Sequence, residues 1–160
     1  MTKPDTNNDL IHLLQRAARA SSAYEWDEVV ALTTQALAFP DLPSEAEYDL
    51  RKGRAVAYEY RGDHQAWLAD AERMQRLAEE SGDVSRQVES GGSRAEALLE
   101  LGRLTEALAV TQVALARARA AEDPKLVANG LQVLAQAKIH YGDVAGAEGY
   151  LVEALERYRS

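Results

Sequence analysis

The sequence predicts an all-α protein built as a stack of four helical hairpins, about eight helices in all. Ala, Leu, Glu and Arg dominate the 160 residues while aromatic residues make up only 6%, and such a composition favours helices over strands. Glycines recur every 40 residues, at Gly62, Gly102 and Gly142, which indicates an internal repeat. One repeat domain spanning residues 1–160 is therefore expected.

The same 40-residue register aligns other small residues in each copy. Ala55 matches Ala95 and Ala135, and a first copy aligns with an offset of 38, which pairs Ala17 with Ala55. The four repeats are predicted at residues 8–40, 44–80, 83–121 and 124–158.

Each copy divides into two helices. The first copy gives helices at 8–22 and 26–39. In the second copy Pro43 and the sequence Ser44-Glu45-Ala46-Glu47 predict a capping box, in which Ser44 and Glu47 satisfy each other's backbone N–H groups, at the start of a helix over 44–61. Gly62 then provides a left-handed stop, and Asp63 caps the next helix, over 64–80.

The last two copies repeat this turn chemistry. Gly102 and Gly142 are expected to end the first helix of each hairpin, while Ser81-Gly82-Asp83 and Asp123-Pro124 separate one copy from the next. The predicted helices cover 83–101, 104–121, 124–141 and 144–158.

Gly91 and Gly92 fall in the middle of a predicted helix, where two glycines cost about 2 kcal/mol relative to alanine. Three explanations are open: close approach of a neighbouring helix, a small pocket beside Lys52 and Gln132, or a helix that restarts at Ser93 with a capping box to Glu96.

Composition argues against several function classes. The chain has no cysteine, which excludes disulfides and thiolate chemistry, and the polar leader MTKPDTNNDL lacks the apolar core of a signal peptide. A net charge of −8 without any Lys/Arg block opposes binding to nucleic acid or to an anionic membrane. The expectation is a cytoplasmic protein.

No catalytic motif is present in the sequence. The histidines His12, His64 and His140 lie in three different copies, and phosphate loops, nucleophile elbows and metalloprotease helices are all missing. We therefore expect a protein that is not an enzyme and that uses no cofactor and no metal.

The repeat resembles the tetratricopeptide repeat family over residues 9 to 158. The resemblance rests on small residues late in the first helix, a Gly-Asp turn, and an Ala-Leu pair late in the second helix, as in YRGDHQAWLADAERM and LGRLTEALAVTQVAL. The 40-residue period is longer than the usual ~34 and is similar to elongated variants in bacterial multidomain regulators. HEAT repeats have a similar length, but the Gly-Asp turn favours the tetratricopeptide family.

This resemblance implies a right-handed superhelix with a concave wall formed by the first helix of each hairpin. The family's groove positions then fall on Ile11, Leu14, Ala18, Asp49, Lys52, Val56, Glu59, Tyr60, Glu89, Gly92, Glu96, Leu99, Glu100, Asn129, Gln132, Gln136, Ile139 and His140. The middle of this wall is acidic and its C-terminal end is rich in carboxamides. An ordinary solvated face is the alternative interpretation of the glutamates.

The wall lacks the basic clamp with which some family members hold chaperone tails, because only Lys52 qualifies. The expected partner is a protein or peptide of basic or amphipathic character.

Arg16, Arg54 and Arg94 occupy one equivalent slot in three copies, where the family usually has a large aliphatic residue. A buried arginine must pair its charge, so structural pairing with acidic residues of adjacent helices is one interpretation. An arginine ladder for an anionic ligand is the other.

Three functions remain open. The first is a protein-interaction scaffold, for example the regulatory part of a signalling protein. The second is a sensor for a small molecule or peptide. The third is self-assembly, because Leu151, Leu155 and Ile139 at one end and Ile11 and Leu14 at the other lack a covering helix. A homodimer through terminal helices would cover them, and truncation from a longer chain is the alternative explanation.

Overall fold

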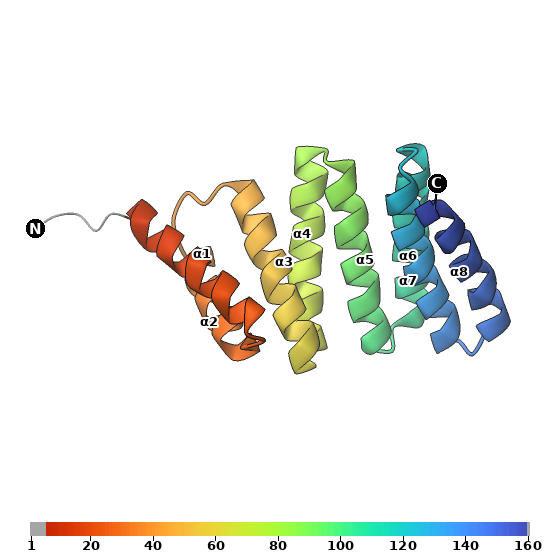
Figure 1. Cartoon of the computed structure of the whole chain (residues 1–160), viewed down its shortest axis with the longest axis horizontal. Coiled ribbons are helices and arrows are strands. Elements are labelled where there is room, and N and C mark those ends of the chain that lie inside the picture. Colours follow the sequence, from red (N-terminus) through yellow and green to blue (C-terminus); the bar gives the residue numbers. More distant parts are fainter. Residues whose placement is uncertain (1–5, 160) are drawn as a thin grey trace, which may run out of the picture. The chain divides into compact units, whose positions relative to one another are not determined.

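The computed structural model describes residues 6–159, which form eight α-helices and no strand (Figure 1). Their bounds are α1 Thr6–Ser22, α2 Trp26–Leu37, α3 Ser44–Arg61, α4 His64–Ser81, α5 Val84–Glu100, α6 Leu104–Ala120, α7 Pro124–His140 and α8 Val144–Arg159. The all-α class is confirmed, and each predicted helix has its counterpart within two residues at either end.

Glycine ends the first helix of three hairpins, as the repeat predicted. Gly62, Gly102 and Gly142 have φ values of 70°, 71° and 78°, the left-handed conformation that glycine adopts without steric cost. In the first copy Tyr24 takes the equivalent place, with φ 59°. The 40-residue period therefore reflects a recurring backbone turn.

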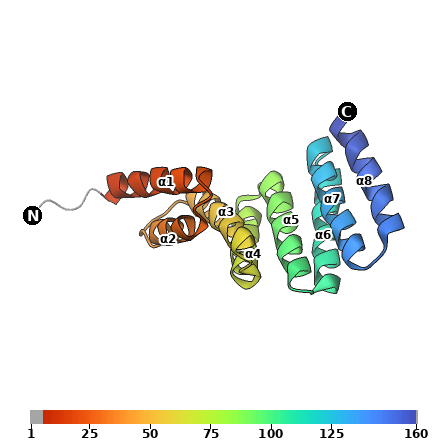
Figure 2. The same ribbon diagram turned by 60° about the horizontal axis from the view of Figure 1, so that its bottom comes forward.

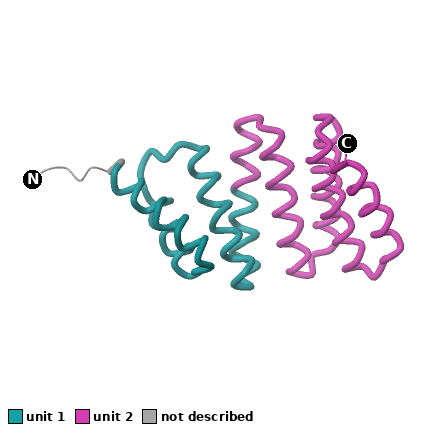
Figure 3. The backbone as a smooth tube through the Cα atoms, viewed as in Figure 1, with its two compact units in different colours: residues 1–73 teal, residues 74–160 magenta. Residues whose placement is uncertain are grey.

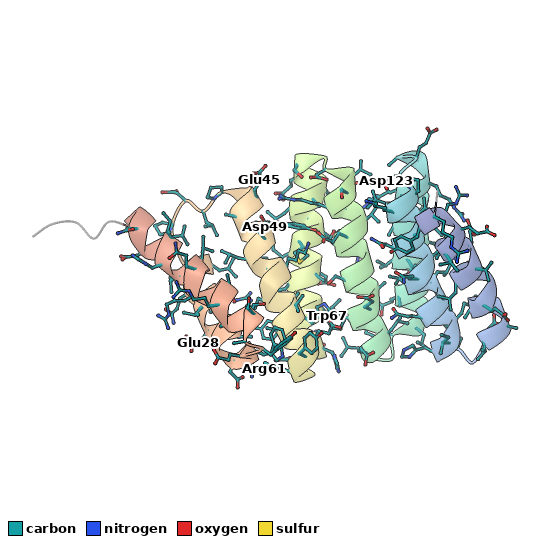
Figure 4. The ribbon with its side chains drawn as sticks, in the orientation of Figure 1. Glu28, Glu45, Asp49, Arg61, Trp67 and Asp123 are labelled. Atoms are coloured by element: carbon teal, nitrogen blue, oxygen red, sulfur yellow. The ribbon has the colours of Figure 1, made fainter. Side chains whose placement is uncertain are left out.

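Aspartates precede four of the described helices, α4, α5, α7 and α8. Asp63, Asp83 and Asp143 each accept a hydrogen bond from the backbone N–H three residues later, at 3.2, 3.0 and 2.9 Å. Asp123, at the start of α7 (Figure 4), accepts from the N–H groups of Lys125 and Leu126. These interactions satisfy N–H groups that lack a partner inside the helix.

The capping box predicted at Ser44 is wrong. Pro43 is the residue that precedes the helix and no side chain caps it. The Glu47 side chain does not bond to the backbone at the helix start because it accepts hydrogen bonds from Arg51 and Arg73. A charged partner outcompetes the neutral backbone N–H.

The chain divides into two compact units, Met1–Arg73 and Met74–Ser160 (Figure 3). In the first unit α1 packs on α2 and α2 packs on α3. Figure 2 shows α1 and α2 lying one above the other. Their shared core holds Ala17, Ala20, Val29, Leu32 and Ala57.

The second unit packs α5 on α6, α6 on α7 and α7 on α8, and α5 also contacts α7. Its core is formed by Val88, Leu115, Ala118, Val127, Ala128, Leu131, Leu134 and Ala154. Small residues let neighbouring helices approach closely, so that within this unit the α7–α8 hairpin covers the apolar side of the α5–α6 hairpin.

Close approach of a neighbouring helix explains the paired glycines. The helix α5 is continuous through both, so no new helix starts at Ser93. A Cβ added to Gly91 would lie 3.0 Å from the Cβ of Ala114 on α6, and one added to Gly92 would lie 3.7 Å from Val133 on α7. Glycine at position 91 thus makes room for α6.

Candidate functional site

A hollow of about 380 Å³ opens between α1 and α3 in the first unit, with α2 as its floor. We call it the α1–α3 hollow. It is lined by Leu14, Ala17, Ala18, Ser21, Val29, Thr33, Ala46, Asp49, Leu50 and Gly53. Three of the predicted wall residues, Leu14, Ala18 and Asp49, are among them. The structure therefore brings residues from two successive repeats together at one place.

The internal repeat explains why this place is open. In the second unit Val133 of α7 fills the space beside Gly92 of α5. In the first unit Gly53 on α3 corresponds to Val133, and Leu14 on α1 corresponds to Gly92. A Cβ added to Gly53 would meet nothing within 4 Å. At Gly53 the side chain of the later copy is therefore missing, whereas Leu14 takes the place of Gly92 and lines the hollow.

The floor of the hollow is apolar in character. Val29 and Thr33 are 2% and 3% exposed. The Thr33 hydroxyl donates to the backbone carbonyl of Val29 at 2.6 Å, so its hydrogen is used inside α2. Asp49 supplies a carboxylate at the rim, on α3 (Figure 4). Such a site suits an apolar group next to a positive charge.

Exposed apolar side chains continue from the hollow along α3. Val56 and Tyr60 follow Asp49 and Gly53 at helical spacing, and they are 37% and 65% exposed. The Tyr60 ring stacks on Trp26, with 4.6 Å between centroids and 5° between planes. Tyr24 meets Trp26 edge-on at 5.7 Å. The stack holds Tyr60 in place while leaving much of it accessible to a partner.

The other predicted wall residues on α3, Lys52 and Glu59, are also exposed. Glu45 and Asp49 add two further exposed carboxylates on the same helix. Around the hollow, therefore, acidic groups outnumber the amine of Lys52.

In the second unit the predicted wall residues do not form a comparable site. Gly92 and Glu96 are half-buried. The prediction for Leu99 is wrong, because this side chain is 4% exposed and belongs to the interior. Its counterparts in the neighbouring copies, Glu59 and Ile139, are exposed, so the burial of Leu99 is specific to this copy.

The carboxamide-rich end of the wall is exposed at Asn129, Gln132, Gln136 and His140. Tyr158 of α8 donates its hydroxyl to the side-chain oxygen of Asn129 and lies 3.4 Å from that of Gln132. Two of the amides thus help to hold α8 on α7.

The repeated arginines make structural pairs in the first unit. Arg54 donates twice to Asp70 of α4, at 2.7 Å each, and once to Thr34 of α2, at 2.9 Å. Asp70 is 2% exposed, and its hydrogen bonds raise the pKa of Arg54. Arg16 pairs with Glu28 at the surface, at 2.8 Å. The Arg54 guanidinium is therefore engaged in hydrogen bonds inside the fold.

Arg94, the third residue of the slot, has a different setting. It donates to the carboxamide of Gln75 at 3.2 Å, and the position equivalent to Asp70 is Val110. A second hollow, of about 200 Å³, lies here between α4, α5 and α6 and is lined partly by Gly91, Arg94 and Arg117. This hollow touches Gly91 but is lined by Gln75 and Gln87, and not by Lys52 and Gln132, beside which the sequence suggested a pocket.

Sequence reasoning missed the ion-pair network that surrounds Arg54. Arg51 donates to both Glu47 and Asp70, at 2.8 Å each. Arg73 donates to both carboxylate oxygens of Glu47, at 2.9 Å each. The Arg73 hydrogen bonds, aided by Arg51, lower the pKa of Glu47 from 4.5 to about 2. The same arginine and acid residues at the same spacing in several copies would have indicated the network from sequence, but only one copy carries them.

Among residues 6–159 no group of three or more acidic, histidine or cysteine side chains is arranged to hold a metal ion. Within the same range, no helix has the length and apolar character needed to cross a membrane. His12 and His140 are exposed and His64 is half-buried against Trp67.

Comparison with known proteins adds no family: the chain matches no protein-family model and no curated protein sequence.

Proposed function

We propose that the chain is a tetratricopeptide-type interaction domain, without catalytic activity, that binds a peptide segment of a partner protein in the α1–α3 hollow. The observation that carries this proposal is the hollow itself, an open apolar cavity formed where Gly53 replaces the filling residue of a later repeat. The consecutive helical hairpins and their recurrent glycine turns fit a helical-repeat fold.

The size of the hollow indicates the kind of group that it accepts. About 380 Å³ lies at the lower end of the range of ligand pockets, roughly 300–1,000 Å³, and holds one large aliphatic or aromatic side chain. Val56 and Tyr60 extend the apolar contact along α3. An amphipathic segment with an anchor residue and a second apolar residue matches this arrangement.

The charge of the surrounding surface indicates the flanking residues. Glu45, Asp49 and Glu59 are exposed near the hollow, and the whole chain carries −8. Lys or Arg beside the anchor would therefore gain from complementary charge, most strongly at low salt.

A displayed library of random peptides, selected on the purified chain, tests the proposal. We expect enrichment of peptides with a Leu, Phe or Trp next to Lys or Arg. The substitution Gly53→Leu fills the hollow without a backbone clash and is expected to weaken these peptides at least about tenfold. The matched control is Gly149→Leu on α8, where an added Cβ also meets nothing within 4 Å.

Selected peptides that bind the Gly53→Leu and Gly149→Leu variants equally well would place the site elsewhere and overturn the proposal. A selection that yields no peptide, together with apolar small molecules whose thermal stabilisation is lost in Gly53→Leu, would instead assign the hollow to a small-molecule sensor.

A further inference from the structure

The outer face of α8 is an exposed apolar stripe. Val144, Leu151, Val152, Leu155 and Tyr158 are 66%, 45%, 52%, 50% and 49% exposed. Their spacing places them on one side of the helix, with Leu151 and Tyr158 at the edge next to the buried Ala147 and Ala154. In residues 6–159 no further helix packs on this side.

The internal repeat identifies this stripe as a stacking surface. The residues of α6 that correspond to Leu151, Leu155 and Tyr158 are Thr111, Leu115 and Ala118. These three are 1%, 5% and 0% exposed, in a unit in which α7 packs on α6. In α8 the same positions carry Leu, Leu and Tyr and are about half exposed.

The corresponding surface at the other end of the chain is polar. The α7 residues on the side where Gly130 meets Leu115 of α6 are Leu126, Gly130, Leu134 and Ala137. Their counterparts on α1 are Asn8, His12, Arg16 and Arg19, and all four are exposed. An α1 helix of another copy is therefore a poor cover for α8, because it would bury polar groups against apolar ones.

We propose that the outer face of α8 is a self-association site, which pairs with α8 of a second copy in an antiparallel, two-fold arrangement. The charges on the stripe select this geometry. Glu148 and Arg159 lie on the same face as Leu155, near opposite ends of the helix. Antiparallel pairing places Glu148 beside Arg159 of the second copy, whereas parallel pairing brings like charges together.

The same register sets Val152 against Leu155 of the second copy. A contact confined to one four-turn helix buries less than the roughly 800 Å² per partner of a standard interface, so the expected dimer is weak, with a dissociation constant of about 10–100 µM. None of the residues that line the α1–α3 hollow takes part. Failure of this proposal would therefore leave the proposed peptide site intact.

Sedimentation velocity of the full chain between about 5 and about 500 µM tests the pairing. We expect the wild-type sedimentation coefficient to rise with concentration from monomer to dimer, and Leu155→Glu to stay monomeric. The matched control is Val113→Glu on α6, because Val113 is also 50% exposed and the change in charge is the same. This control should dimerise as the wild type does.

A charge exchange tests the antiparallel register. Glu148→Arg sets two arginines against each other and should weaken the dimer about tenfold, and adding Arg159→Glu should restore it. A wild-type chain that is monomeric over the whole range would overturn the proposal. So would a dimer that Leu155→Glu leaves unchanged.

Discussion

Asp70 is a carboxylate with 2% exposure that is bonded to both Arg51 and Arg54. Burying a charge costs several kcal/mol unless partners compensate for the lost hydration. Here two guanidinium groups do so, and Thr34 takes a further Arg54 hydrogen. The network joins α2, α3 and the first part of α4, so it holds the floor and one wall of the α1–α3 hollow in register.

Replacing Asp70 by Asn should be strongly destabilising, because it leaves Arg54 without the charge that balances it and leaves Arg51 with Glu47 alone. We expect a loss of about 3 kcal/mol in the free energy of unfolding. Urea unfolding provides the measurement. Glu28→Gln is the comparison, since the Arg16–Glu28 pair is exposed and should contribute less than about 1 kcal/mol. Equal losses in the two variants would refute this account of Asp70.

The pKa of Glu47 predicts a pH dependence of stability. Because the folded-state pKa is about 2 and the ordinary value is 4.5, the ionised group stabilises the fold above pH 4.5. That contribution, on the order of 3 kcal/mol, is lost as the pH falls from 4.5 toward 2.

Unfolding curves of the wild type and Glu47→Gln at a series of pH values test this. The variant should be less stable at neutral pH, and the difference should shrink as Glu47 of the wild type becomes protonated. A difference that does not change between neutral pH and pH 2 would show that Glu47 is not ionised through its arginine contacts.

At the scale of the element, glycine has three distinct roles in this chain. It ends helices at positive φ, as at Gly62; it allows close approach, as at Gly91; and it leaves open space, as at Gly53. The sequence alone separates the first role from the others, because a turn residue such as Asp63 follows. The last two roles depend on the facing helix.

An alanine series distinguishes these roles by unfolding free energy. Gly53→Ala and Gly149→Ala add a Cβ to open space in a helix and should each stabilise the chain by about 1 kcal/mol. Gly91→Ala brings a Cβ to 3.0 Å from that of Ala114 and should destabilise by about 1–3 kcal/mol. A stabilised Gly91→Ala variant would contradict the close approach of α5 and α6.

The link between α6 and α7 contains a strained residue. Glu122 has φ 55°, while its counterpart one repeat earlier, Gly82, has φ 72°. A non-glycine residue in this region costs about 1–2 kcal/mol. Glu122→Gly should therefore raise the thermal midpoint, and Gly82→Ala should lower it by a comparable amount. A lower midpoint for Glu122→Gly would mean that its side chain makes a contact worth more than the strain.

At the scale of the whole molecule, the parts of the fold that could be predicted are those that local chemistry determines. Helix ends follow from Gly62, Asp63 and their repeats, because a cap involves only neighbouring residues. Asp70 was missed because its arginine partners lie 16 and 19 residues away, on another helix. Local spacing does not reveal such pairs.

The helices that form the candidate site could be predicted from the sequence, but only some of its residues could. The resemblance placed it on the first helix of each hairpin, and Leu14, Ala18 and Asp49 do line the hollow. It did not predict Gly53, whose importance appears only when α1 and α3 face each other, nor the burial of Leu99. The same exposed face in two repeats can be open in one and filled in the other.

The most direct test of the binding site is the mapping of a selected peptide by methyl and amide NMR. We expect the largest shift changes at Leu14, Val29 and Gly53, with Val56 next, and none at Leu155 on α8. The largest changes in α5 to α8, or changes at Gly53 that persist when the peptide's anchor residue is replaced by alanine, would contradict a peptide site in the α1–α3 hollow.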